Sequence, residues 1–203
     1  MDSLKVMLGM YAGLTGFSLL VSGYLWATTR ARLWAELTAV WGATCVLFVA
    51  SGMAANLGVP AIALTEGFAS LPIMTAIWVL IYDLLGVAPR WSRWRKMAVA
   101  TVLPSLTALG LGAPFVVYAW LWVIAQSSIL VDALVLASRR WTTLTPAIKG
   151  VAFMCAVHLF NGLTYPVGRL EPEFASIGFS LTIAANLGFA VFAPMAIAEV
   201  RAR

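Results

Sequence analysis

The chain has 203 residues, of which 62% are hydrophobic and 10% are charged, and its mean hydropathy is +0.94. Soluble domains carry about 25% charged residues, so this composition excludes an ordinary soluble protein. It predicts an all-α integral membrane protein whose main partner is the lipid bilayer. The formal net charge of +5 does not indicate a nucleic-acid partner, because short loops hold the basic residues, where membrane topology and anionic headgroups account for them.

Repeated apolar runs of about 20 residues predict membrane-spanning helices. Helices are the expected structure because lipid satisfies no backbone polar groups and no alternating strand pattern is present. The first run is too long for the hydrophobic region of a secretion signal, and no small-residue cleavage site follows it. We therefore predict a single seven-helix transmembrane domain over residues 1–203. Its helices cover residues 4–27, 34–57, 60–86, 97–112, 114–138, 146–166 and 174–198.

The basic residues predict the orientation of this bundle. Eleven of the 13 lysines and arginines follow the first, third, fifth and seventh helices, whereas only Lys5 and Arg169 lie at the other side. Positively charged loops stay in the cytoplasm. We expect a multi-pass protein of the plasma (inner) membrane, with its N-terminus outside and its C-terminus in the cytoplasm.

The inventory of reactive groups is small. Cys45, Cys155 and the only histidine, His158, all fall inside predicted helices, and a single histidine without partner ligands makes no structural zinc site. No phosphate-binding glycine loop, paired catalytic carboxylates or nucleophile arrangement is present. We predict no enzymatic activity, no catalytic residues and no metal site.

Carboxylates inside a bilayer are costly and mark candidate sites. Asp83 and Asp132 lie near the arginine-rich end, where an interfacial ion pair with Arg or Lys is the expected role. Glu66, with Ser70 one turn further along the same helix, has no basic residue at its depth. It is either an interior carboxyl that is neutral or hydrogen-bonded, or a glutamate at the outer membrane boundary.

Two further helices carry polar stripes. His158, Asn161, Gly162 and Tyr165 are spaced i, i+3, i+4 and i+7, which places them on one helix face. Thr182 and Asn186 are one turn apart on the last helix. Since lipid satisfies no polar groups, we expect Glu66, Ser70, His158, Tyr165, Thr182 and Asn186 to converge on one interior volume.

Three segments resemble the microbial (type I) rhodopsin family. The segment "TEGFASLPIMTAIWVLI" is similar to the family's third helix, with an acidic counterion, a hydroxyl and a proline at Glu66, Ser70 and Pro72. The segment "NGLTYPVG" is similar to its sixth helix at Tyr165. The segment "TIAANLGFA" is similar to its seventh helix at Gly188. The resemblance implies a seven-helix fold with a ligand cavity between the third, sixth and seventh helices.

The departures from the family pattern limit what the resemblance implies. The Schiff-base lysine falls on Asn186, and an amide forms no imine. A second carboxylate falls on Thr182, and the two tryptophans that enclose retinal fall on Gly67 and Gly162. The resemblance therefore implies a lysine-less opsin with no covalent cofactor and no light-driven pumping. The family's arginine gate and its proton donor are missing as well, at positions now held by Ala63 and Ile77.

Several functions remain open at this point. The first is non-covalent binding of an apolar small molecule, such as a retinoid or carotenoid, at Glu66, Ser70, His158, Gly162, Tyr165, Thr182 and Asn186, or action through a partner protein. The second is a small polytopic transporter or channel that uses the same polar groups. The third is an accessory subunit of a membrane complex, or a homo-oligomer.

Overall fold

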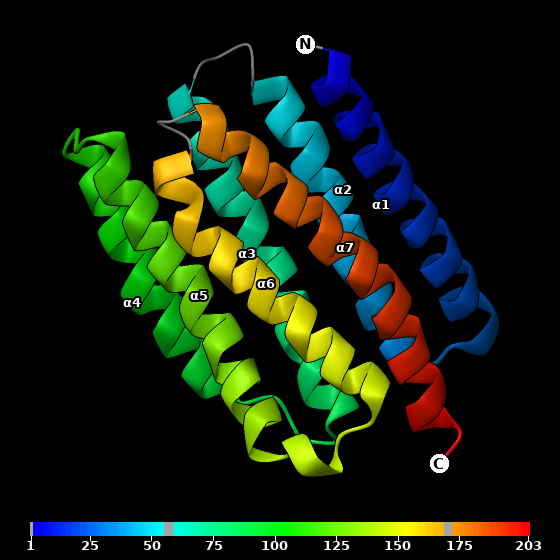
Figure 1. The fold of residues 1–203 in the computed structure, drawn as a ribbon. Coiled ribbons are helices and arrows are strands. Elements are labelled where there is room, and N and C mark those ends of the chain that lie inside the picture. Colours follow the sequence, from blue (N-terminus) through cyan, green and yellow to red (C-terminus); the bar gives the residue numbers. More distant parts are fainter. Residues whose placement is uncertain (1, 55–58, 169–171) are drawn as a thin grey trace. The chain divides into compact units, whose positions relative to one another are not determined.

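The structure is a computed structural model that describes residues 2–54, 59–168 and 172–203. Helix makes up 90% of it, and no strand occurs in these ranges. The predicted all-α fold is confirmed. The α-helices of the described residues are α1 (Asp2–Thr29), α2 (Arg32–Ala54), α3 (Val59–Leu84), α4 (Trp91–Gly110), α5 (Phe115–Arg139), α6 (Pro146–Gly168) and α7 (Pro172–Arg201), and a short 3-10 helix, η2 (Trp141–Thr143), precedes α6 (Figure 1).

Five of these helices are long and apolar enough to cross a membrane. The candidate spans found in the described residues are Leu8–Thr29, Arg32–Met53, Phe115–Arg139, Pro146–Thr164 and Ser180–Arg201. In α3 the apolar stretch found is the shorter Phe68–Leu84, and the first turns of α4 hold several basic residues. The chain is therefore a helical, multi-pass membrane protein.

The chain divides into two compact units, residues 1–80 and residues 81–203. In the first unit α1 packs against α2, where Tyr11 and Phe48 meet edge to face with ring centroids 5.8 Å apart. Leu37 and Trp41 of α2 are buried.

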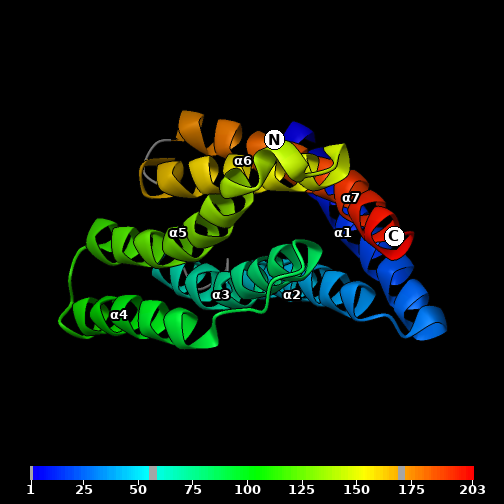
Figure 2. The same cartoon turned by 90° about the horizontal axis from the view of Figure 1, so that it is seen from below.

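In the second unit each helix from α4 to α7 packs on the next one along the chain. Figure 2 shows α4 and α5 running in opposite directions from one connecting turn. The centre of this unit is lined by small and branched side chains, which include Ile129 and Ala133 of α5, Cys155 of α6 and Ala193 of α7.

Glycines end α3 and α4 in the same way. Gly86 and Gly112 have φ of +64° and +70°, a conformation that side chains with a Cβ avoid. In each case the residue after the glycine donates its N–H back across the helix end, Val87 to the Tyr82 carbonyl at 2.9 Å and Ala113 to the Ala108 carbonyl at 2.9 Å. This is the Schellman pattern of helix termination, and it fixes where the chain leaves each helix.

Candidate functional site

A hydrogen-bonded group of four polar side chains joins α6 to α7. We call His158, Asn161, Thr182 and Asn186 the α6–α7 polar network. Asn161 Nδ2 donates to Thr182 Oγ1 at 2.7 Å, and the Asn186 side chain is hydrogen-bonded to the imidazole of His158. Three residues of the predicted site, His158, Thr182 and Asn186, are therefore brought together.

The two members of the network on α7 are also anchored to their own helix. Thr182 Oγ1 donates to the Gly178 carbonyl at 3.0 Å, and Asn186 Nδ2 donates to the Thr182 carbonyl at 2.9 Å. Asn186 is only 6% exposed, so its amide lies inside the second unit. An uncompensated amide in such a place would cost several kcal/mol, and these bonds compensate it.

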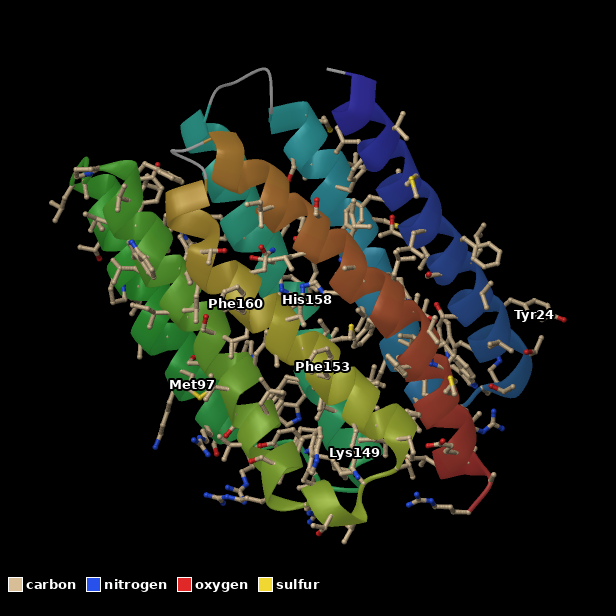
Figure 3. The ribbon with its side chains drawn as sticks, viewed as in Figure 1. Tyr24, Met97, Lys149, Phe153, His158 and Phe160 are labelled. Atoms are coloured by element: carbon tan, nitrogen blue, oxygen red, sulfur yellow. The ribbon has the colours of Figure 1, made fainter. Side chains whose placement is uncertain are left out.

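The outer face of α6 is apolar. Phe153 and Phe160, labelled with His158 in Figure 3, are 60% and 61% exposed. They are two turns apart and therefore lie on one face of the helix. His158 is half-buried and bonded to α7, so the polar stripe of α6 is turned toward its neighbour, as a membrane helix requires.

Close packing supports this pairing of helices. A Cβ added to Gly150 would overlap the ring of Phe192, and one added to Gly188 would overlap Met154. Gly162, in contrast, has no described atom within 4 Å of the Cβ position. The helices thus touch closely at Gly150 and Gly188, whereas no described atom lies near the Cβ position of Gly162, one turn from His158.

The remaining residues of the predicted site are less defined. Glu66 and Tyr165 lie within α3 and α6, but their side chains are outside the described residues. Ser70 is half-buried in α3 and belongs to the first unit. Convergence of Glu66 and Ser70 with the α6–α7 polar network stays a prediction.

A second polar cluster lies in the second unit around Asp132, whose side chain is 5% exposed. Tyr82 Oη donates to Asp132 Oδ2 at 2.6 Å, and Arg93 Nη1 lies 2.8 Å from Oδ1. Near these residues in the sequence, Arg140 Nη1 donates to the Leu85 carbonyl at 2.7 Å. The predicted ion pair of Asp132 with a basic residue is confirmed, whereas the sequence reasoning missed Tyr82.

The chemistry available to the α6–α7 polar network is limited and specific. It contains two amides, one hydroxyl and one imidazole, and no nucleophile beside a base. No group of three or more metal-ligating side chains occurs within residues 2–54, 59–168 and 172–203. The network can donate and accept hydrogen bonds in an apolar setting, and its imidazole can hold a proton.

No protein-family model, curated protein or solved structure matches the chain.

Proposed function

We propose that this protein is a rhodopsin-like seven-helix membrane protein that lacks the retinal-linking lysine and binds an apolar ligand, such as a retinoid or carotenoid, non-covalently. The observation that carries the proposal is the α6–α7 polar network, with Asn186 at its centre in the position where the resemblance places the lysine. The protein acts as a binding protein and not as an enzyme or a light-driven pump.

Two features of the network support ligand binding over a purely structural role. Polar groups between membrane helices contribute about 0.6–2 kcal/mol each to association, and the close contacts at Gly150 and Gly188 already hold α6 to α7. Small-molecule sites are largely apolar with a few convergent polar groups. Gly162, beside these groups, has no described atom within 4 Å of its Cβ position, which leaves room for a ligand where the rhodopsin family has a tryptophan.

The proposal includes seven membrane spans with the N-terminus outside. Its support is that α4 packs against the candidate span in α5, and that basic residues cluster at one end of the second unit. By this topology the turn at Leu111, which is 82% exposed, faces outward, and Arg203 faces the cytoplasm.

This topology predicts the outcome of cysteine labelling. In intact cells an impermeant maleimide should label Leu111→Cys, whereas Arg203→Cys should react only after permeabilisation. The unsubstituted chain, with Cys45 and the buried Cys155 inside helices, is the control for background labelling. Labelling with the two positions reversed would show that the orientation is wrong.

Ligand binding is tested with retinal and the purified protein. We expect a saturable absorbance change with retinal that solvent extraction fully reverses, because Asn186 forms no imine and the three lysines, Lys5, Lys96 and Lys149, are near the helix ends. Borohydride reduction and digestion should yield no retinyl peptide. Absence of saturable binding of both retinal and a carotenoid would contradict the proposed ligand class.

Asn186→Lys gives the same proposal a gain-of-function test. With retinal, this variant should form an imine at position 186 and a band red-shifted from free retinal, because a carboxylate keeps the imine protonated and a protonated imine absorbs at longer wavelength than free retinal. Adding Gly162→Trp should reduce ligand uptake by filling the open space. A folded Asn186→Lys variant with no band at any pH would overturn the rhodopsin-like assignment.

A further inference from the structure

The first turns of α4 present a basic face that the α6–α7 polar network does not use. Ser92, Arg95 and Lys96 are exposed and spaced i, i+3 and i+4, and Val99 and Ala100 continue the same face one turn further on. A shallow, open surface region lies along these five residues.

The two cations on this face are available to bind an anion. Arg93, which directly follows Ser92 in the sequence, pairs instead with Asp132, with Nη1 2.8 Å from Oδ1. Neither Arg95 nor Lys96 forms an ion pair or hydrogen bond with any residue that the structure describes.

The fold sets the depth of this face in the membrane. α4 packs along α5, which is a candidate span, and the Arg93–Asp132 pair ties the start of α4 to the last two turns of α5. Arg95 and Lys96 lie on the first two turns of α4, from where their long side chains can reach the lipid headgroups. Val99 and Leu103, which are 56% and 57% exposed, lie further along α4, toward the hydrocarbon.

We propose that this face of α4 is a binding site for an anionic phospholipid. Arg95 and Lys96 hold the phosphate, Ser92 donates a hydrogen bond to it, and the acyl chains lie over Val99 and Leu103. Positive charge above an exposed apolar strip matches a charged headgroup with its chains, whereas a free phosphate would leave that strip uncovered. The site is separate from the proposed ligand site and does not depend on which way the bundle faces.

The test uses the full-length protein in neutral detergent and counts bound lipid by native mass spectrometry. The probes are phosphatidylglycerol and zwitterionic phosphatidylcholine, and the variant is Arg95→Gln/Lys96→Gln. We expect phosphatidylglycerol to bind more tightly than phosphatidylcholine. Each cation removed near a membrane surface weakens binding about fivefold, so the variant should bind phosphatidylglycerol about 30-fold more weakly. Binding of phosphatidylcholine should change by less than about twofold.

A matched control removes the same charge at the same end of the second unit. Arg201→Gln/Arg203→Gln, with both residues exposed at the end of α7, should weaken phosphatidylglycerol binding less than about twofold. Equal losses of phosphatidylglycerol affinity in the two variants would show that surface charge acts without a specific site, and would overturn the proposal. No loss of affinity in either variant would overturn it as well. Competition by inorganic phosphate as strong as that by the lipid would overturn the lipid as occupant. Circular dichroism verifies that both variants keep their helix content, and no arm of the test requires retinal.

Discussion

Gly150→Ala is expected to lower the free energy of unfolding by about 1–3 kcal/mol, the usual cost of overfilling a close contact. The added methyl group would overlap Cγ, Cδ1 and Cδ2 of Phe192. These atoms form the base of a rigid ring, so relief requires α6 and α7 to move apart. The measurement is reversible unfolding in mixed micelles with increasing dodecyl sulfate, followed by circular dichroism.

Two other glycines on the same helix pair provide graded controls. Gly188→Ala meets Met154, whose flexible thioether side chain can move aside, so its cost should be smaller. Gly162→Ala meets no described atom within 4 Å and should stabilise the helix by up to about 1 kcal/mol through helix propensity alone. The reverse order of the three variants would mean that α6 and α7 do not pack in the register described above.

Much of the helical architecture could be predicted because each helix end is marked locally. The predicted range 114–138 is shifted by one residue from α5, which covers Phe115–Arg139, because Pro114 and the Arg139–Arg140 pair mark those ends. Likewise α6 begins at Pro146 as predicted, since proline is favoured at the first position of a helix. These signals need no knowledge of the neighbouring helices.

The start of α4 was predicted wrongly, at residue 97, whereas α4 begins at Trp91. Arg93, Arg95 and Lys96 were assigned to a loop because charged residues are excluded from lipid. In the structure they form the first turns of the helix, where Arg93 reaches Asp132 and the other two are exposed. A hydropathy pattern records the loss of apolar character but not the tertiary partner that keeps the backbone helical.

The candidate site was predictable only in part, for a related reason. The spacing of His158 and Asn161 places both on one face of α6, and that of Thr182 and Asn186 does the same on α7. Which residue bonds to which depends on how far one helix is shifted along the other. The close contact of the Phe192 ring with Gly150 helps set that shift. A single sequence does not show which residues of α6 meet which residues of α7.

Arg93→Met is expected to be the most destabilising change at the Asp132 cluster, with a loss of about 2–3 kcal/mol. Removing one partner of a buried ion pair costs about 3–5 kcal/mol. The expected loss here is smaller because the Arg93 side chain is 55% exposed, and exposed ion pairs contribute less to stability. The variant removes the arginine partner of Asp132, whose side chain is 5% exposed, while the Tyr82 hydroxyl still donates to it. The measurement is again unfolding in mixed micelles.

Substitution of the acid should cost much less than substitution of the base. Asp132→Asn keeps an acceptor for Tyr82 and leaves no buried charge, and the long side chain of Arg93 can turn to the headgroups, so a loss under about 1 kcal/mol is expected. The stability of the double variant Arg93→Met/Asp132→Asn should then be close to that of Asp132→Asn alone, which a double-mutant cycle measures.

Arg95→Met is the control for loss of one charge on α4, because Arg95 is two positions away and has no acidic partner among the described residues. If Arg93→Met and Arg95→Met cost the same in neutral detergent, the Arg93–Asp132 pair does not stabilise the second unit, and α4 is held to α5 by apolar packing alone.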